Sequence, residues 1–494
     1  MAGEPLAGRR AGLTPAQRAL LAKRLRSGAQ GLAEEDPGMG PRPESGPAPA
    51  SFGQRRLWHF AGRQPGNLAY NVYYAVRLSG TLDTAALAGS VRALIDRHEA
   101  LRTRFEPRGG DLVAVAAPEL VPAGLPLIDL AGVLDPGSRE TEAWRAMTEL
   151  AAPPFDLGRG PLLRTALVRT AAGDHSLLFA VHHAVIDGWS LALITRDLAA
   201  AYEALAAGRP VSWAAAPLQS GDFAHWQRRQ VREGSLAGDL AWWRGYLAGA
   251  PAKGLSWSAR PPAPGGRTAR RLEPDTVQRL KALAQGERVT PFVVLLAGLD
   301  ALLHHWTGKT DLIVGTPLAL RGRPEAGSIV GFLLNVLPLR TDLSGDPTFL
   351  ELLHRARDAF LGALAHREPP IEWLAEELLP GRDPGALPWV QVLFNMPSGE
   401  TGHSDPLRVH GVELQPLLTG EMASEIDLTF YARELEGGIR LGLGYNANVL
   451  APGEPARLIG GFRALVAAAV ARPGQRLSEL AGALLSTAGV EAEG

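Results

Sequence analysis

The spacing of apolar residues predicts alternating strands and helices from about residue 51 onward. Residues 71–80, NVYYAVRLSG, alternate like a strand, whereas apolar side chains in residues 83–101 recur with a helical period. Residues 175–183, HSLLFAVHH, form a continuous apolar run of strand length, which is typical of a strand buried on both faces. A helix is expected after this run, and Ser190 is a suitable residue to cap it.

The second half of the chain continues the same alternation. Thr290-Pro291 begins a predicted helix over residues 290–306, because proline is favoured at the first helical position. Further strands are predicted, followed by a last helix that starts near Pro455, and the strands fall at residues 311–317, 388–397, 425–436 and 438–447. The pattern therefore predicts two mixed α/β lobes, divided somewhere between about residues 205 and 255.

The N-terminal segment has a different composition from the rest of the chain. Residues 1–27 include a short amphipathic helix, for which Thr14 is the expected N-cap. Residues 28–50 are so rich in Gly, Pro and Ser that we expect a flexible linker, because such a segment buries too little apolar surface to order itself. The folded body is expected to start near Ser51.

Composition excludes several classes of function. Hydrophobic residues make up 46% and charged residues 20% of the chain, a balance typical of globular proteins. The 50 Lys and Arg residues face 51 Asp and Glu residues, so there is no net positive field to attract nucleic acid or an anionic membrane. The chain has no cysteine and no apolar run near the roughly 20 residues that span a bilayer. We therefore expect a cytoplasmic protein without disulfides or thiolate metal sites.

The stretch VHHAVIDGWS, residues 181–190, holds the most suggestive chemistry. Successive side chains of a strand point to opposite faces, so only one of His182 and His183 can reach a given cavity. The Asp187-Gly188 step permits a tight turn that directs the positive end of the next helix to the same region. A neutral imidazole at this place suits proton transfer near neutral pH.

Asp187 needs a cation if it is buried, because an unpaired buried carboxylate is costly. In the N-terminal half the nearest candidates are the three arginines of RHEALRTRF, Arg97, Arg102 and Arg104. Asp187 could otherwise face solvent or orient the histidine.

Structural explanations compete with a catalytic one. Adjacent histidines commonly belong to a packed core or a surface, and the pair His304-His305 has no Asp-Gly step after it. A metal site is disfavoured, because two histidines on opposite faces of a strand cannot share one ion and no third clustered ligand appears. The chain lacks the serine nucleophile elbow, the phosphate-binding loop and the zinc-protease helix motif. The residues alone leave a histidine-dependent enzyme and a structural pair equally open.

Several motifs together resemble the condensation domains of nonribosomal peptide synthetases, which are related to chloramphenicol acetyltransferase. VHHAVIDGWS resembles their HHxxxDG motif, and SFGQRRLWHF (51–60) their opening SxAQxRLW. Further stretches resemble motifs of the family, given in parentheses after each stretch. They are RHEALRTRF at 97–105 (RHExLRTxF), GDFAHWQ at 221–227 (YxDFAxWQ), GTPLALRGRPEAGSIVGFLLNVLPLR at 315–340 (GTPxxxRxRPE…IGxFVNxxxLR), HREPPIEWL at 366–374 (HQDxPFExL), and PWVQVLFNMP at 388–397 with EIDLTF at 425–430 (the closing motifs). In the family's order they cover residues 51–485.

This resemblance implies an α/β fold of two acetyltransferase-like lobes in a V-shaped pseudodimer with a central channel. The lobes would be residues 51–220 and 221–485, followed by a tail at 486–494. Donor and acceptor peptidyl carrier proteins would each insert a phosphopantetheine arm, and the donor thioester would be attacked by the acceptor amine to form an amide. No bound cofactor or metal is expected, nor a nucleic-acid or membrane partner.

The resemblance also assigns roles to residues. His183 would position or deprotonate the amine, and Asp187 would be structural, paired with Arg102. Gly188 would let substrate approach closely, with an oxyanion stabilised by nearby backbone N–H groups. The expected supporting and channel residues are His182, Trp189, Ser190 and Asn335.

Some features leave the reaction open. Ile186 stands where the family commonly has Ser, Ser220 replaces the usual Tyr, and HREPPIE replaces HQDxPFE. Donor stereochemistry is therefore not predicted. The acceptor could also be a free small-molecule amine or alcohol. Formation of an ester with an alcohol acceptor, and a non-catalytic recruitment role, are the alternatives. The Met start and N-terminal helix favour a free-standing enzyme over an excised domain.

Overall fold

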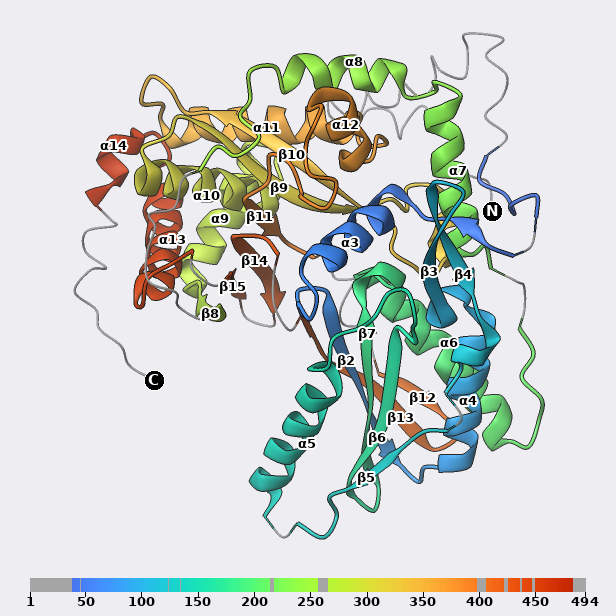
Figure 1. Ribbon diagram of the computed structural model, residues 1–494. Helices are drawn as coiled ribbons and strands as arrows, with labels where there is room; N and C mark the ends of the chain where they lie inside the picture. The colour runs from blue at the N-terminus through green and yellow to red at the C-terminus, as the bar shows by residue number, and fades with distance from the viewer. Residues whose placement is uncertain are drawn as a thin grey trace, which may run out of the picture.

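A computed structural model places the chain in two lobes, each built on a six-stranded sheet (Figure 1). The structure describes residues 38–44, 46–122, 124–133, 135–213, 217–255, 265–397, 406–421, 425–435, 438–446 and 449–482. The predicted N-terminal helix, the first part of the predicted linker and the tail at 486–494 lie outside the described residues. The two-lobed α/β architecture predicted from the sequence is confirmed.

The sheet of the first lobe is mostly antiparallel. Its strands, in spatial order, are β12 (Leu407–Val409), β13 (Val412–Glu421), β2 (Asn71–Gly80), β7 (Asp174–His182), β6 (Leu163–Ala171) and β5 (Leu127–Asp129). β2 matches the predicted strand at 71–80, and β7 is almost wholly buried from Leu177 onward, as the apolar run predicted.

Helices cover both faces of this first sheet. α4 (Thr84–Arg97) and α6 (Gly188–Ala206) pack on the face that carries Val76, while α5 (Pro136–Ala151) packs on the face that carries Ala75. The alternation along β2 thus supplies apolar side chains to two separate layers. The predicted helix over 83–101 ends earlier than expected, at Arg97, and is followed by the 3₁₀ turn η1 (Glu99–Arg102).

The second lobe repeats the plan with a mixed sheet. Its strands, in spatial order, are β10 (Leu334–Asp342), β9 (Asp311–Ala319), β11 (Val392–Asn395), β14 (Leu428–Leu435), β15 (Gly438–Tyr445) and β8 (Gly266–Arg271). β11 runs parallel to both of its neighbours. The long helices beside this sheet are α9 (Pro274–Gly286), α10 (Pro291–Thr307), α11 (Phe349–Ala365) and α13 (Glu454–Ala471).

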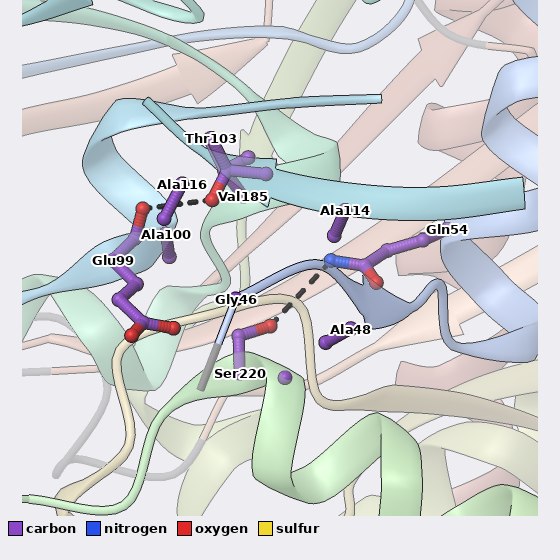
Figure 2. A pocket seen from close by; sticks show the side chains of 11 residues that line it. Gly46, Ala48, Gln54, Glu99, Ala100, Thr103, Ala114, Ala116, Val185 and Ser220 are labelled. Atoms are coloured by element: carbon purple, nitrogen blue, oxygen red, sulfur yellow. Dashed lines mark hydrogen bonds between the residues drawn. The ribbon is translucent and has the colours of Figure 1, made fainter. Parts of the chain in front are cut away.

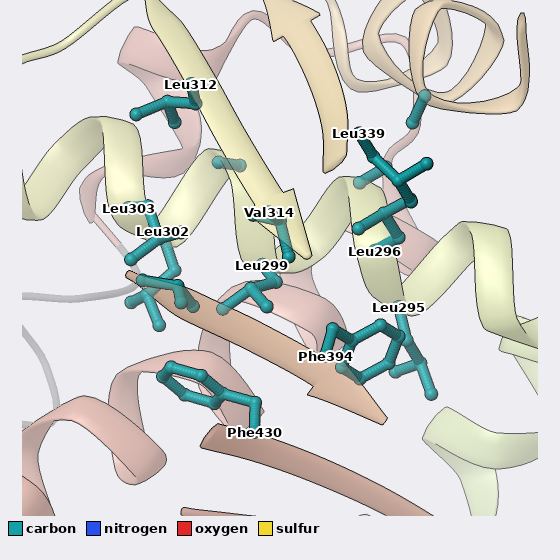
Figure 3. Packing of buried hydrophobic residues seen from close by; sticks show 14 of the residues in the cluster. Leu295, Leu296, Leu299, Leu302, Leu303, Leu312, Val314, Leu339, Phe394 and Phe430 are labelled. Atoms are coloured by element: carbon teal, nitrogen blue, oxygen red, sulfur yellow. The ribbon is translucent and has the colours of Figure 1, made fainter. Parts of the chain in front are cut away.

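Helix α10 lies at the centre of the second lobe. Its leucines pack against β9, β10 and β11 (Figure 3), and every residue from Val293 to Leu303 is buried. A helix that is apolar on nearly all sides is expected to be enclosed in this way. No single helix among the described residues is long and apolar enough to cross a membrane, although α9 and α10, bent by 108° relative to each other, meet that criterion as a pair.

The remaining elements are shorter. A small sheet contains β1 (Ala48–Pro49), β4 (Asp111–Ala116) and β3 (Thr103–Arg108). The remaining helices of the described ranges are α3 (Phe52–Arg63), α7 (Ser220–Arg232), α8 (Ala237–Tyr246), α12 (Ile371–Leu378) and α14 (Leu477–Leu480). The 3₁₀ turns besides η1 are η2 (Pro118–Leu120), η3 (His183–Val185) and η4 (Pro324–Ser328).

The prediction that residues 28–50 form a flexible linker is wrong for its last part. Met39, Ala48 and Ala50 are buried, and the Arg42 side chain forms ion pairs with Glu99 at 2.9 Å and Asp222 at 3.1 Å. Met39 packs in a cluster with Phe223 and Trp226, and Arg42 is held by carboxylates of other elements, and neither contact is revealed by composition. The folded body therefore begins before Ser51.

The predicted division at residues 220 and 221 also needs correction. β12 and β13 come from the second half of the chain, yet they extend the first sheet, where β13 pairs antiparallel with β2. The chain then returns to the second lobe at β14. Edge pairing of this kind depends on backbone hydrogen bonds, so the hydrophobic pattern of the two strands did not indicate which sheet they join.

Candidate functional site

β7 carries the double histidine to the junction of the lobes. The strand ends at His182, whose backbone N–H donates to Leu162 O at 3.0 Å, while the N–H of His183 donates to Tyr70 O at 2.8 Å. The side chain of His182 is buried, and its Nδ1 accepts a hydrogen bond from the N–H of Ala184 at 3.1 Å. Burial, with a smaller contribution from the neighbouring His183, lowers the pKa of His182 to about 3. His182 is therefore a neutral, structural imidazole.

His183 has a different environment. Its ring is partly buried, and Nδ1 lies 2.6 Å from the carbonyl oxygen of Ile186. A carbonyl oxygen can only accept, so Nδ1 must carry the hydrogen of this bond. In the neutral ring, Nε2 then carries the lone pair and can accept a proton. The backbone of the HHxxxDG segment thus selects the tautomer that a general base requires.

Two aromatic rings from distant parts of the sequence contact the His183 imidazole. Phe332, just before β10, lies 5.3 Å away between ring centroids at an interplanar angle of 83°, and Tyr70, just before β2, lies 6.4 Å away at 74°. Both are edge-to-face arrangements. Residues from both halves of the chain therefore enclose this imidazole.

Asp187 is the N-cap of α6, which corrects the prediction that Ser190 caps this helix. Asp187 Oδ1 accepts hydrogen bonds from the backbone N–H of Ser190 at 2.9 Å and from its hydroxyl at 2.7 Å. The helix begins earlier than expected because the Asp side chain reaches the free N–H groups of the first turn. In the second lobe, the N–H of Leu333 donates to Asp187 Oδ2 at 3.2 Å.

The cation that pairs with Asp187 is Arg321, not Arg102. Arg321 Nη2 lies 2.9 Å from both carboxylate oxygens, and the side chains of Arg321 and Asp187 are 2% and 0% exposed. Arg321 Nη1 also donates to the carbonyls of Ala326 and Ile329, each at 2.7 Å. The prediction of a buried, paired Asp187 is confirmed, and the predicted partner is wrong.

The arginines of RHEALRTRF are all engaged elsewhere. Arg102 donates to the carbonyl of Asp96 at 3.3 Å, Arg97 pairs with Asp197 and Arg104 pairs with Glu106. Nearness in sequence misled the prediction, because the buried carboxylate faces the other lobe. The sequence did contain a feature that could have indicated the correct partner of Asp187, because Arg321 is the first arginine of the GTPxxxRxRPE pattern.

The residues after Asp187 also reach the second lobe. The Ser190 hydroxyl accepts from the Gly331 N–H at 3.1 Å, and its single hydrogen is shared between Asp187 Oδ1 at 2.7 Å and Gly331 O at 3.1 Å. Trp189 Nε1 donates to Gly327 O at 3.0 Å, and the Arg321 guanidinium lies 5.8 Å from its ring centroid. Gly188 is exposed, and no atom of the described residues lies within 4 Å of a Cβ built on it. Its predicted role in admitting substrate stays a prediction.

Asn335 uses its side chain to hold a loop of the second lobe. Nδ2 donates to the carbonyls of Arg367 and Pro369 at 2.9 and 2.8 Å, and Oδ1 accepts from the N–H of Ile371 at 3.0 Å. These bonds fix the segment that leads into α12. Asn335 therefore supports the second lobe's side of the site, and its predicted place on a channel wall remains a prediction.

A buried charge network next to the site was not predicted. Arg56 of α3 pairs with Glu372 at 3.2 Å and with Glu425 at 2.7 Å, and it donates to the Tyr70 hydroxyl at 3.0 Å. The Tyr70 hydroxyl donates in turn to Glu425. Arg56 belongs to the SxAQxRLW resemblance, whereas Glu425 lies at the return to β14, so their contact required the three-dimensional structure.

A small pocket lies behind the histidine loop (Figure 2). Its lining includes Val185 of η3 and four polar side chains, those of Gln54, Glu99, Thr103 and Ser220. Gln54 also donates to the carbonyl of Ala184 at 3.0 Å. The pocket therefore borders the back of the loop, while the His183 ring is contacted by Tyr70 and Phe332.

The second histidine pair lies at the end of α10. His304 Nδ1 is 2.7 Å from Lys309 O, which is a local structural contact. Within the described ranges, no group of three or more His, Asp or Glu side chains could hold a metal ion.

Comparison with known proteins identifies the family to which this chain belongs. The Condensation domain family model matches residues 44–488. One of the linear gramicidin synthase proteins of Brevibacillus parabrevis is 37% identical over 460 residues, which cover 92% of this chain and 9% of that protein. The chain belongs to the condensation domain family of nonribosomal peptide synthetases, and it spans about a tenth of this much longer relative.

Solved condensation-type domains share the fold. A complex of the X-domain and OxyB from teicoplanin biosynthesis contains a chain that matches with a TM-score of 0.78 and 28% identity, over 90% of this chain and 98% of that one. The first condensation domain of the calcium-dependent antibiotic synthetase, bound to a substrate analogue, matches with a TM-score of 0.72 and 26% identity, over 88% of this chain and 99% of that one.

Proposed function

We propose that this chain catalyses amide formation, transferring an acyl or aminoacyl group from a carrier-protein phosphopantetheine thioester to an acceptor amine. The observation that carries the proposal is the Nδ1 bond of His183 to Ile186 O, which leaves Nε2 as a proton acceptor at the junction of the lobes. A thioester is already activated, so alignment of amine and carbonyl supplies much of the rate enhancement.

Each neighbouring group has a part in this mechanism. His183 Nε2 orients the amine or takes its proton as the nitrogen attacks the thioester carbonyl. In this mechanism the positive end of α6, which starts at Gly188, stabilises the developing oxyanion. Collapse of the tetrahedral intermediate releases the donor's phosphopantetheine thiolate, which takes up the proton lost by the amine. Asp187 and Arg321 hold the segment that carries these groups.

The direct test compares His183→Ala with His304→Ala. The assay measures product mass with donor-loaded carrier and paired amine and alcohol acceptors. Removal of a general base typically costs ~10²- to 10⁴-fold in rate, so amide formation should fall by that factor in His183→Ala and stay at the wild-type rate in His304→Ala. Equal rates in the two variants would contradict the proposal, and ester as the sole product would replace amide formation with acyl transfer to an alcohol.

A recruitment role is the second candidate, because the X-domain neighbour was solved in complex with OxyB. A domain of this fold is thereby seen bound to a second protein. If product assembly survived His183→Ala but required the domain to be present, this candidate would be favoured.

A further inference from the structure

The Phe332 ring packs so closely on Gly53 that a side chain at position 53 would clash with it. A Cβ built on Gly53, in the first turn of α3, would lie 2.6 Å from Phe332 Cε1 and 3.2 Å from Cδ1. Real Cβ atoms essentially never approach another atom as closely as the first of these distances. The ring of Phe332 therefore occupies space that is open only because residue 53 has no side chain.

The backbone does not require a glycine at this position. Gly53 lies within a helix and is not among the glycines with positive φ. Glycine is less favourable than alanine in a helix, because it loses more conformational freedom on folding. The contact with Phe332 supplies the steric reason for the missing Cβ. In the SxAQxRLW pattern this position is Ala, and Phe332 falls within the stretch that resembles IGxFVN.

Phe332 is fixed from both sides. The N–H of Gly331 donates to the Ser190 hydroxyl at 3.1 Å, and the N–H of Leu333 donates to Asp187 Oδ2 at 3.2 Å. The side chain is 7% exposed and packs edge-to-face on the His183 imidazole at 5.3 Å. At this distance the two rings are in van der Waals contact, so no substrate atom fits between them.

We propose that Phe332 is a specificity-determining residue. Its ring packs against His183 in the space that Gly53 leaves open, and it limits the size of the group bonded to the reacting nitrogen. The inference rests on the proposed function. The Nδ1 edge of the imidazole is occupied by Ile186 O, and Tyr70 and Phe332 contact the ring. A nitrogen at Nε2 therefore has little lateral room, and amines with a small substituent on the adjacent carbon are preferred over branched ones.

The first experiment measures acceptor selectivity. Wild type and Phe332→Ala are assayed with glycyl and valyl groups on the same acceptor carrier and with the same donor. A pocket discriminates by about 10- to 200-fold for a small change in apolar size. We expect the ratio of kcat/KM for glycyl over valyl to be high in wild type and to fall by about 10-fold or more in Phe332→Ala. An unchanged ratio overturns the proposal.

The second experiment tests the coupling of the two residues. Gly53→Ala should lower both the melting temperature and the rate, because the new Cβ displaces the ring. Gly53→Ala combined with Phe332→Ala should recover the melting temperature relative to the sum of the single changes. Gly62→Ala, in the same helix, is the matched control, because a Cβ there meets no atom within 4 Å in the part of the chain that the structure describes. Additive melting temperatures, or equal effects of Gly53→Ala and Gly62→Ala, would overturn the coupling.

The two experiments separate the two proposals. If wild type forms no amide with any acceptor, the proposed function fails, whereas the melting temperatures still report the contact of Gly53 with Phe332. If amide forms with unchanged selectivity, the proposed function stands and the role of Phe332 fails.

Discussion

Asp187 and Arg321 form a buried ion pair across the junction of the two lobes, with both carboxylate oxygens 2.9 Å from Arg321 Nη2. The remaining bonds of the carboxylate go to Ser190 and to the N–H of Leu333. One carboxylate thus caps α6, ties it to the second lobe and fixes the segment that carries Phe332. Its position close to His183 in the same loop makes this pair the structural support of the reaction site.

Removal of one partner of this pair should damage folding. Arg321→Ala leaves the Asp187 carboxylate buried and unpaired, for which a loss of about 3–5 kcal/mol in the free energy of unfolding is typical. Arg102→Ala is the matched control, because Arg102 donates to the Asp96 carbonyl at 3.3 Å and its loss should cost under about 1 kcal/mol. Urea denaturation of both variants checks this expectation. A larger loss in Arg102→Ala than in Arg321→Ala would contradict the assignment.

The pKa of His182 should make stability depend on pH. Its folded pKa is about 3, below the ordinary value of 6.5, so the unfolded chain binds the proton more readily. Its contribution to stability is present above about pH 6.5 and is lost as the pH falls toward 3. Between pH values of about 6.5 and about 4.5 the loss is about 2 kcal/mol.

His182→Asn keeps an acceptor for the Ala184 N–H but does not titrate. We expect its free energy of unfolding, measured by urea denaturation, to decline less steeply than that of wild type over this pH range. Substitution of the exposed His410 by Asn should leave the wild-type slope unchanged. A wild-type slope in His182→Asn would rule out His182 as the titrating group.

Sequence patterns predicted the elements of the fold better than their partners. The alternation in β2 and the proline at the start of α10 are local signals, and both elements begin where expected. The pairing of β13 with β2 and of Arg321 with Asp187 joins residues far apart in the chain, for which periodicity has no signal. Strand alternation predicted that the two histidines differ in environment, and they do, but the Nδ1 bond that distinguishes His183 is to a backbone carbonyl and requires coordinates.

Tyr70 should contribute to stability through its hydroxyl. Burial raises its pKa well above the ordinary value, with further influence from Arg56 and Glu425, so the phenol stays protonated and donates to Glu425. Tyr70→Phe removes this donor from a partly buried carboxylate, and we expect a loss of about 1 kcal/mol in the free energy of unfolding. Thermal unfolding of Tyr70→Phe, Glu425→Gln and the double variant measures the coupling. Strictly additive losses would show that the hydroxyl and the carboxylate do not interact.

Asp300 should destabilise the second lobe as the pH rises. The residue is 1% exposed in the core of α10, and neither carboxylate oxygen has a hydrogen-bond partner among the described residues. Burial raises its pKa to about 7, and the nearby Thr341 hydroxyl reduces this effect only in part. Because the folded pKa lies above the ordinary 3.8, the folded state favours the proton, and stability is lost as the pH rises from 3.8 through about 7.

Asp300→Asn removes that ionisation, so its stability relative to wild type should increase by about 3 kcal/mol between pH values of about 4.5 and about 7.5. Asp358→Asn is the control, since that carboxylate is 68% exposed on α11. Urea denaturation at the two pH values measures both differences. If the difference in the free energy of unfolding between Asp300→Asn and wild type did not increase with pH, the Asp300 carboxylate would have to be paired or hydrated in solution. Water would then reach the core around α10 despite its packed leucines.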